Sequence, residues 1–544
     1  MNKIAHYLQQ HISGEILTSE DVLRYFSTDE SILQLQPQIV VYPRSDKDIR
    51  KVARFTWQLR EKGRAVSMTP RGMGTDQTGA SLGNGIVMAL PAHMNRVIEL
   101  DPKTGVIVVE AGMTLDKIQQ VLHTHGRFLP PVSVVNKYAT IGGALGNNDS
   151  GRASYKYGPM QEFVRGVKVV LANGELIETG RLTKRELNKK LGLASFEGEL
   201  YRSLDKLIED SYEVIEPLKK LVAHSKAGFN VSDVKQKDGS FDLTPLILGS
   251  QGTLGVITEA TLDTAAFNPV TDLLVAGFAD RSQAWKAVTE INKMKDGPAC
   301  VDFVDESLIR MVQDINPGVL KALDGGTPAV LLFVEIDDES VRGRKKVHKK
   351  VLKVLEDAQA QIVVTNEDDR DQWERVRDAA SVYLTHRSAK KQALPVMDDA
   401  QVPVERMTEF FNELESLMQA AGIDEYAAWG QAGNGLIHVA PLLDISSVGD
   451  RQRLFKIMEA YYGYICQIGG SIAAEYAEGR LRGQFSDKQF SPEAIELFRK
   501  IKSIFDPTKT LNTGVKFDTD MNDLKSMIRS EYSLDHQYNH LPRS

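Results

Sequence analysis

The amino-acid sequence predicts an α+β protein built of more than one unit, and three observations lead to this class. Apolar runs such as Ile39–Tyr42 are strand-sized and far short of the roughly 18 residues that cross a bilayer. Between these runs lie segments whose apolar residues recur at helical spacing. The chain has 544 residues, 42% of them apolar and 26% charged, a globular composition with room for about three or four domains.

The first elements predict a ligand-binding domain. Residues 1–35 are expected to form short helices, because capping residues such as Thr18 precede an apolar periodicity. The strand Ile39–Tyr42 is followed by an amphipathic helix and by a second strand at 65–68, which runs directly into the glycine-rich loop Pro70–Gly79. A strand, a helix, a strand and a glycine loop are a common frame for binding a small molecule.

The later elements predict a larger first domain and a separate second unit. Asn173-Gly174 lies between two apolar runs and predicts a β-hairpin, whereas residues 182–240 are charged and helical in pattern. Strands are expected again from Leu246. From about residue 270 onward, strands alternate with charged helices, which is typical of a second α+β unit.

Charge and cysteine content exclude several classes of protein. The net charge of -7 disfavours a dedicated nucleic-acid binder, which would normally carry a basic excess. Two cysteines, Cys300 and Cys466, cannot form a disulfide framework, a zinc ribbon or a cysteine-held iron–sulfur cluster. The segment Met1–Gln10 lacks the apolar stretch of a secretory leader, so we expect a cytoplasmic protein without targeting or transmembrane segments.

Three glycine-rich loops carry the first chemical signal. In Pro70–Gly79, Gln77 stands where a dinucleotide fingerprint requires glycine, and no Gly-Lys-Ser/Thr follows, so the loop is neither a Rossmann turn nor a P-loop. A tight structural turn is the alternative. However, Ala139–Gly151 and Gly249–Gly255 are also dense in small residues. Because three such loops can line a long groove, they favour an extended dinucleotide over a single phosphate.

These motifs, in this order, resemble those of FAD-linked oxidases and dehydrogenases of the vanillyl-alcohol oxidase / p-cresol methylhydroxylase type. Within that group the chain is most similar to the D-2-hydroxyacid dehydrogenase branch, which includes D-lactate, glycolate and D-2-hydroxyglutarate enzymes. The likeness runs from about residue 25 to 516 and includes Ile141–Gly151 with Lys156-Tyr157-Gly158, Gly249–Glu259 and the terminal segment Asp506–Lys516.

The resemblance implies a two-subdomain PCMH-type FAD-binding domain and an α+β cap domain with an antiparallel sheet. The expected units are an N-terminal helical segment (1–35), the FAD-binding domain (36–265) with a helical insertion (182–240), the substrate or cap domain (270–465), a C-terminal segment returning to the FAD domain (466–516) and a loose polar tail (517–544). Thr75 and Asp76 lie where some relatives attach flavin through histidine, so FAD is expected to be non-covalent.

The resemblance also implies the residues that contact FAD. They are Pro70, Arg71, Gly72, Met73, Gly74, Thr75, Thr78, Gly79, Pro131, Ser133, Thr140, Ile141, Gly142, Gly143, Gly146, Asn147, Asn148, Ser150, Gly151, Tyr157, Gly158, Gly252, Thr253, Gly255, Val256, Ile257 and Asn512.

Oxidation of a 2-hydroxy acid requires a cation for the carboxylate and a base for the hydroxyl proton. By resemblance, Arg377 is the carboxylate-binding residue, with Arg375 as the alternative. Gln431 and Tyr476 stand where metal-using relatives have histidine, so no metal site is expected. His438 or Tyr476 would then accept the proton, and Glu475 would orient them.

The expected function is therefore FAD-dependent oxidation of a small anionic 2-hydroxy acid, similar to D-lactate, glycolate or D-2-hydroxyglutarate, by hydride transfer to flavin. The electrons would pass to a partner protein, a quinone or oxygen. Two alternatives keep the FAD. One is an enzyme for another alcohol or a sugar, or for an ether-lipid synthase-like reaction without net redox change. The other is a flavin-binding protein that has lost catalysis.

Overall fold

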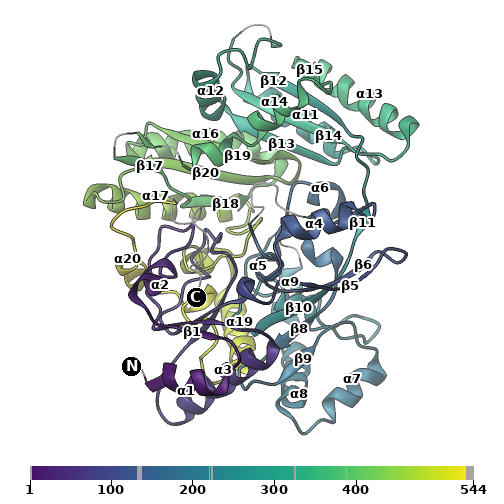
Figure 1. Ribbon diagram of the computed structural model, residues 1–544. Helices are drawn as coiled ribbons and strands as arrows, with labels where there is room; N and C mark the ends of the chain where they lie inside the picture. The colour runs from purple at the N-terminus through teal and green to yellow at the C-terminus, as the bar shows by residue number, and fades with distance from the viewer. Residues whose placement is uncertain are drawn as a thin grey trace.

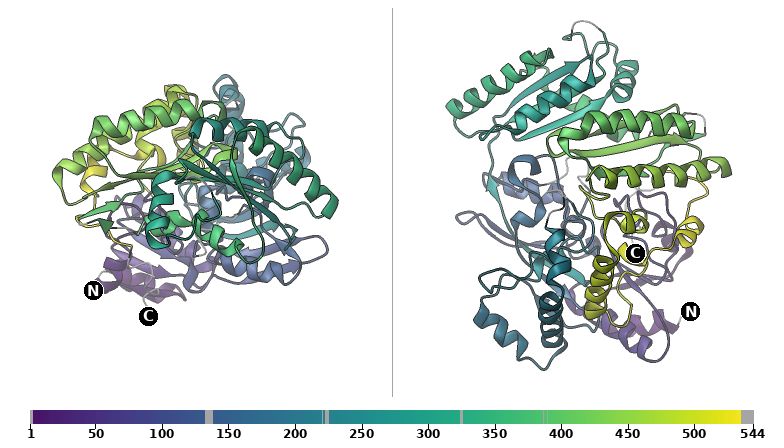
Figure 2. Two further views of the ribbon diagram at one scale, coloured as in Figure 1. Left: turned by 90° about the horizontal axis from the view of Figure 1, so that it is seen from above. Right: turned by 180° about the vertical axis from the view of Figure 1, so that it is seen from behind.

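The computed structural model describes residues 3–131, 138–219, 221, 225–323, 326–385, 387–388 and 390–534. Figure 1 shows two parts of the molecule, an N-terminal domain below and a cap domain above, with the last part of the chain returning into the lower domain. The view from behind in Figure 2 shows the cap domain lying across the N-terminal domain. No helix in the described ranges is both long and apolar enough to cross a membrane.

A four-stranded sheet forms the first subdomain. Its strands, in spatial order, are β1 (Glu15–Leu17), β2 (Ile39–Tyr42), β4 (Ile86–Ala89) and β3 (Met68–Arg71), with the last three parallel. The helices beside them are α1 (Lys3–His11), α2 (Glu20–Tyr25) and α3 (Asp46–Glu61). Helix α3 packs through Ile49, Val52 and Ala53, as the helical spacing predicts, and its connection makes β2 and β3 parallel.

An antiparallel five-stranded sheet forms the second subdomain. Its order is β5 (Val97–Asp101), β6 (Val106–Glu110), β10 (Val256–Asp263), β8 (Val164–Val170) and β9 (Leu176–Glu178), and a two-stranded ribbon of β7 (Arg127–Phe128) and β11 (Ala265–Ala266) lies apart from it. The predicted hairpin joins β8 to β9, and Gly174 in its turn adopts φ 84°. This positive φ is the reason for glycine at that position.

The helices of this subdomain are α4 (Leu115–His123), α5 (Ile141–Asn147), α6 (Ser154–Tyr157), α7 (Lys184–Leu191), α8 (Phe196–Asp210), α9 (Tyr212–Leu218) and α10 (Thr244–Ile247). Helices α7 to α9 occupy the segment 182–240, where a charged helical pattern was noted. The expected strand at Leu246 is wrong, because residues 244–247 form the helical turn α10 and the strand begins only at Val256. Pro245 in the first turn of α10 favours this helical start.

The cap domain contains a nine-stranded sheet. Its order is β15 (Gln361–Val364), β12 (Asp272–Phe278), β14 (Val330–Ile336), β13 (Cys300–Asp305), β19 (Tyr426–Gln431), β20 (Leu436–Leu443), β17 (Lys391–Ala393) and β16 (Arg387–Ser388), with β18 (Met397–Gln401) also paired to β20. Within the described residues, the strand pairs of this sheet are antiparallel. This sheet agrees with the predicted fold class.

Both faces of this sheet are buried, and successive residues of β12 lie alternately in one core and the other. Leu274 and its neighbours at two-residue spacing share a core with α11 (Arg281–Asn292) and α13 (Val341–Asp357). Leu273 and Val275 share another core with helices of the opposite face. The remaining cap helices are α12 (Glu306–Ile315), α14 (Arg370–Arg377), α15 (Ala379–Tyr383), α16 (Met407–Ala421) and α17 (Val448–Gln467).

The C-terminal segment closes the N-terminal domain. It contains α18 (Ser486–Gln489), α19 (Pro492–Phe505) and α20 (Met521–Ser526). Met68 at the start of β3 donates its N–H to Thr510 O (2.7 Å) and accepts from Asn512 N (2.9 Å). The tail was expected to be loose, but Arg529 and Tyr532 are buried, and Arg529 donates to the carbonyls of the N-terminal segment. Packing by these two large side chains overrides the polar composition around them.

Candidate functional site

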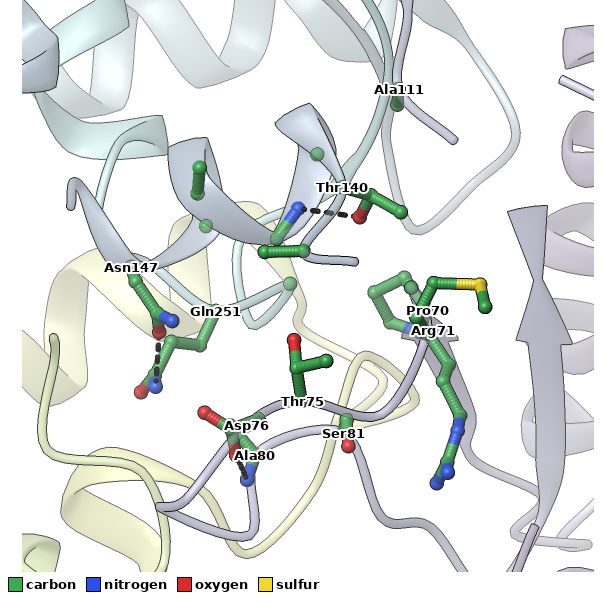
Figure 3. A pocket seen from close by; sticks show the side chains of 18 of the residues that line it. Pro70, Arg71, Thr75, Asp76, Ala80, Ser81, Ala111, Thr140, Asn147 and Gln251 are labelled. Atoms are coloured by element: carbon green, nitrogen blue, oxygen red, sulfur yellow. Dashed lines mark hydrogen bonds between the residues drawn. The ribbon is translucent and has the colours of Figure 1, made fainter. Parts of the chain in front are cut away.

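The three glycine loops meet around one cavity. We call it the glycine-loop cavity; the residues that line it are Pro70, Arg71, Gly72, Met73, Gly74, Thr75, Asp76, Gln77, Ala80, Ser81, Leu90, Ala111, Ala139, Thr140, Gly142, Gly143, Ala144, Gly146, Asn147, Asp149, Gln251, Gly252, Gly255, Ile257 and Tyr476. Figure 3 shows the first loop facing helix α5 across this space.

The first loop approaches α5 so closely that only glycine fits. A Cβ at Gly72 would lie 2.4 Å from Thr140 Oγ1, while Gly74 adopts φ 79°. Thr140 caps α5 by accepting the N–H of Gly143 at 3.2 Å. Asp76 bends the loop back on itself by accepting the N–H of Ala80 at 2.7 Å (Figure 3). Gly72 is therefore required by close contact with the Thr140 side chain, and Gly74 is favoured by its positive φ.

Gln251 connects the three loops, and sequence reasoning missed it. Its side-chain Nε2 donates to Asn147 Oδ1 (2.9 Å) and to Thr78 Oγ1 (3.2 Å), and its Oε1 accepts the N–H of Gly479 (2.9 Å). Its backbone has φ 51°, which is uncommon outside glycine. The available signal was its place inside the glycine loop Gly249–Gly255, where a lone amide side chain suggests cross-loop hydrogen bonding.

Asn512 holds the first and third loops together from the C-terminal segment. Its Nδ2 donates to Ala80 O (2.8 Å) and to Gln251 O (2.6 Å), and its Oδ1 accepts from Thr69 Oγ1 (3.0 Å). Asn512 does not line the cavity. It positions the backbone that does.

The structure brings many of the predicted cofactor residues to the cavity wall. Those that line it are Pro70, Arg71, Gly72, Met73, Gly74, Thr75, Thr140, Gly142, Gly143, Gly146, Asn147, Gly252, Gly255 and Ile257. Those that are described but do not line it are Thr78, Gly79, Pro131, Ile141, Asn148, Ser150, Gly151, Tyr157, Gly158, Thr253, Val256 and Asn512. Ser133 lies outside the described residues. Residues that line it but were not predicted include Asp76, Gln77, Ala111, Asp149 and Gln251.

The wall fits a bound cofactor. At Gly146 a Cβ would meet only Gln251 Cα, at 3.7 Å, and at Gly143 only Thr140 Oγ1, at 3.4 Å, so open space lies beside both glycines. Asp149 Oδ1 is buried without a hydrogen-bond partner, and burial raises the pKa of Asp149 well above its ordinary value. An unsatisfied buried polar group beside glycines that leave room is what a planar polar cofactor would complement.

A second cavity adjoins the first. We call it the charged cavity; it is lined by Gln77, Arg152, Asp302, Phe303, Arg377, Ala380, Asp398, Trp429, Gly430, Gln431, His438, Glu475 and Tyr476. Gln77 and Tyr476 line both cavities. All four predicted catalytic residues lie in this wall, whereas Arg375 on the same helix as Arg377 is exposed.

Arg377 lies at the centre of a buried ion-pair cluster. Its Nε donates to Asp302 Oδ2 (2.8 Å), Nη1 to Glu335 Oε2 (3.0 Å) and Nη2 to Cys300 Sγ (2.8 Å). Arg152 shares Asp302 through its own Nε at 2.9 Å. Each nitrogen of the Arg377 fork therefore already has a protein partner, an arrangement that the sequence did not indicate for a substrate carboxylate clamp.

His438 lies between two carboxylates. Its Nδ1 is 2.5 Å from Asp398 Oδ1, and its Nε2 is 2.8 Å from Glu475 Oε2. Burial alone would lower its pKa, but the charges and hydrogen bonds of both acids raise the pKa of His438 well above its ordinary value. Both ring nitrogens of His438 thus contact a carboxylate oxygen, so neither is free to accept the hydroxyl proton of a substrate.

Tyr476 and Gln431 occupy the positions where the sequence departs from histidine. Burial, with the charges of Glu475 and Asp149, raises the pKa of Tyr476 well above its ordinary value, so the phenol keeps its proton. Gln431 donates through Nε2 to Ser150 O at 2.8 Å and thereby joins the cap to the second loop. Among the described residues, no group of three or more His, Cys, Asp or Glu side chains is arranged to hold a metal ion.

Two protein families match the chain: FAD binding domain over residues 37–180, and FAD linked oxidases, C-terminal domain over residues 268–515. The D-2-hydroxyglutarate dehydrogenase of Escherichia coli (strain K12) is 27% identical over 540 residues, which cover 94% of this chain and 51% of the relative. The chain thus spans about half the length of the D-2-hydroxyglutarate dehydrogenases it matches. Glycolate oxidase subunit GlcD of Bacillus subtilis (strain 168) is 26% identical over 491 residues, 90% of each chain.

Among solved structures, p-cresol methylhydroxylase with substrate bound aligns with a TM-score of 0.69 at 14% identity, over 96% of this chain and 97% of that chain. This likeness concerns the fold alone. Together these matches confirm the predicted fold class, the family resemblance and FAD as the cofactor.

Proposed function

Because the chain combines an FAD binding domain with the C-terminal domain of FAD linked oxidases, we propose that it is an FAD-dependent oxidoreductase that oxidises the hydroxyl of a small 2-hydroxy acid. The observation that carries the proposal is the junction of the two cavities at Gln77 and Tyr476. A cofactor held in the glycine-loop cavity and a substrate held in the charged cavity would therefore meet at these two residues. The relatives named above oxidise 2-hydroxy acids according to their names, which supports the substrate class.

The glycine-loop cavity would hold FAD without a covalent bond, since none of its described lining residues is histidine or cysteine. The loop backbones around Gly72, Gly143 and Gly252 would carry most of the contacts. Bound FAD would supply the two-electron acceptor for the hydrogen on the substrate's carbinol carbon. The electrons would leave afterwards to a partner protein, a quinone or oxygen.

The charged cavity would bind the substrate and take the hydroxyl proton. The carbon–hydrogen bond breaks as a hydride, the oxygen–hydrogen bond loses a proton, and a 2-oxo acid remains. Both ring nitrogens of His438 are occupied, so the proton would pass to a carboxylate of the chain Asp398–His438–Glu475. Burial raises the pKa of Glu475 above its ordinary value, although the hydrogen bond and charge of His438 lower it. Tyr476 would donate a hydrogen bond.

Arg377 and Arg152 are the cations of this cavity. A substrate carboxylate would have to replace one of the acids that they now bind, for example Glu374, which is 3.4 Å from Arg377 Nη1. Because both arginines already have acidic partners, a second candidate function is also favoured. In it, the same oxidation acts on a neutral alcohol or a sugar, which needs no cationic partner.

The test is anaerobic bleaching of the flavin. The protein is reconstituted with FAD, and its visible spectrum is recorded after addition of D- or L-2-hydroxy acids, with and without a chelator. We expect one enantiomer to bleach the yellow colour, regardless of the chelator. Arg377→Ala should abolish this bleaching, while Arg375→Ala, on the exposed face of α14, should leave it unchanged. A yellow protein that no hydroxy acid bleaches would contradict the substrate class, and a colourless one would contradict FAD binding.

A further inference from the structure

Two carboxylates of the charged cavity each have an oxygen without a hydrogen bond. Asp302 is 5% exposed and Asp398 4% exposed, and both line the cavity. Asp302 Oδ2 accepts from Arg377 and Arg152, and Asp398 Oδ1 binds His438, but Asp302 Oδ1 and Asp398 Oδ2 have no partner in the described part of the chain. A buried charged acceptor left unsatisfied costs about 1–3 kcal/mol or more, so these atoms require donors.

Two of the donors in the same wall already have protein partners. The guanidinium of Arg377 donates to Asp302 Oδ2, Glu335 and Cys300, and the amide of Gln431 donates to Ser150 O. Neither donor satisfies Asp302 Oδ1 or Asp398 Oδ2, which a ligand could satisfy. A ligand that satisfied these atoms would bring hydroxyl or ammonium groups, rather than a second carboxylate.

We infer that the substrate is polyhydroxylated: besides the hydroxyl that is oxidised, it carries at least one more, which donates to Asp302 while the reacting hydroxyl donates to Asp398. This inference rests on the proposed function and narrows its substrate class from 2-hydroxy acids in general to those with a neighbouring hydroxyl, such as sugar acids.

Hydroxyl groups fit the two atoms better than ammonium groups. Asp302 already has two guanidinium partners, and Asp398 already has the imidazolium of His438. The charge of each acid is thus compensated, and the remaining oxygen lacks only a hydrogen bond. A second cation at either atom would lie next to an existing cation in a buried site, which is unfavourable.

Two matched pairs of compounds test the inference on the FAD-loaded protein. D-Glycerate differs from D-lactate by one hydroxyl, and glycerol differs from (R)-propane-1,2-diol in the same way. We expect the compound with the extra hydroxyl to reduce the flavin with a kcat/KM at least about tenfold higher in the acid pair, because a site built around a substrate hydroxyl rejects the analogue that lacks it. Equal rates within the acid pair would overturn the inference and leave the proposed function standing.

The two neutral compounds, glycerol and (R)-propane-1,2-diol, separate the 2-hydroxy acid assignment from the inference of an extra hydroxyl. If glycerol is oxidised as fast as D-glycerate, no carboxylate is needed, and the 2-hydroxy acid assignment fails while the hydroxyl inference stands. If none of the four compounds reduces the flavin, the proposed function fails, and titration calorimetry of the same compounds decides the inference. Binding of D-glycerate about tenfold tighter than D-lactate, or glycerol than the diol, would then support it. Equal or undetectable binding would overturn it.

The variant Asp302→Asn tests whether Asp302 is the residue responsible for the preference for D-glycerate over D-lactate. The amide oxygen must face the two arginines, so an N–H group replaces the free acceptor, and the ratio of D-glycerate to D-lactate should fall close to one. Asp378→Asn is the matched control, because Asp378 also pairs with Arg152 but does not line the cavity. A wild-type ratio in Asp302→Asn would exclude Asp302 as the hydroxyl acceptor. If this variant does not fold, the wild-type pairs still decide the inference.

Discussion

The two adjoining cavities are built in opposite ways. The glycine-loop cavity is walled by backbone, glycine, alanine and side-chain amides, with Arg71, Asp76 and Asp149 as its only charged lining residues in the described chain. The charged cavity is walled by coupled ionisable groups such as Arg377 and His438. A large ligand of fixed shape is recognised by space and backbone contact, whereas proton and hydride chemistry requires positioned charges. Substitutions in the first wall should therefore act through sterics, and those in the second through electrostatics.

The largest effect is expected from filling the space beside Gly146. Gly146→Leu should weaken FAD binding at least about 100-fold, or about 2.7 kcal/mol, and leave folding intact, because a Cβ there meets only one atom within 4 Å. Gly449→Leu is the matched control, since Gly449 is also helical and open but lies in α17, away from both cavities. Flavin absorbance after reconstitution measures the difference. A fully yellow Gly146→Leu protein would show that this wall does not face the cofactor.

The next effect concerns the charged wall. Arg377→Met keeps much of the side-chain volume but leaves Asp302 and Glu335 without their main partner. Breaking a buried pair in this way costs about 3–5 kcal/mol of unfolding free energy. Urea denaturation measures the loss, with Arg375→Met as the exposed control on the same helix. A loss below about 1 kcal/mol, which is the value of a surface ion pair, would mean that the cluster is not coupled to folding.

A smaller effect should appear only in acid. Burial favours the neutral form of Glu335, but the charge and hydrogen bond of Arg377, with Thr271 and Arg370, outweigh it and lower the pKa of Glu335 to about 2. A lowered pKa stabilises the fold above the unfolded value of 4.5, and this contribution is lost as the pH falls toward about 2. At about 1.36 kcal/mol per unit, and with partial exposure, it amounts to roughly 2–3 kcal/mol.

Glu335→Gln should therefore be less stable than the wild type at neutral pH and equal to it near pH 2. Denaturation curves across this range check the expectation. The exposed acid Glu367, replaced by Gln, serves as control and should leave the profile unchanged. Parallel wild-type and Glu335→Gln profiles would contradict the ion pair.

The smallest effect is expected at the boundary between the cavities. Tyr476→Phe removes a donor but no base, because the pKa of Tyr476 is raised well above its ordinary value by burial. Flavin reduction should slow by up to about tenfold, the value of one neutral hydrogen bond, and keep the shape of its pH profile. Tyr155→Phe, which loses a bond to Asn292 instead, is the control. Loss of the alkaline limb in Tyr476→Phe alone would identify Tyr476 as the base.

The wall of the glycine-loop cavity could be predicted from the sequence because its constraints act on single short loops. Gly72 and Gly252 are glycines since a Cβ would collide with Thr140 and Pro70, and such constraints leave a readable pattern of small residues. Sequence reasoning missed Gln251, whose role depends on three loops meeting. It also placed a strand at Leu246, because a short apolar run fits a strand as well as a buried helical turn.

The partners of Arg377 could not be read from the sequence. Cys300 and Asp302 share one face of β13 at two-residue spacing, and Glu335 on β14 pairs with Cys300 across the ladder. Only the register of these two strands brings the three groups to one guanidinium. The available signal was a charged residue, Asp302, between the apolar residues Val301 and Phe303 of the strand.

The bracketing of Met68 by Thr510 and Asn512 has a consequence for biosynthesis. The strand that leads into the first glycine loop is hydrogen-bonded to a segment that is synthesised more than four hundred residues later. A nascent chain that lacks this segment therefore has an incomplete pocket. Flavin uptake by a complete pocket must follow synthesis of this segment. A prematurely terminated product that lacks this segment would leave the loop unanchored and would be a substrate for proteolysis rather than a smaller flavoprotein.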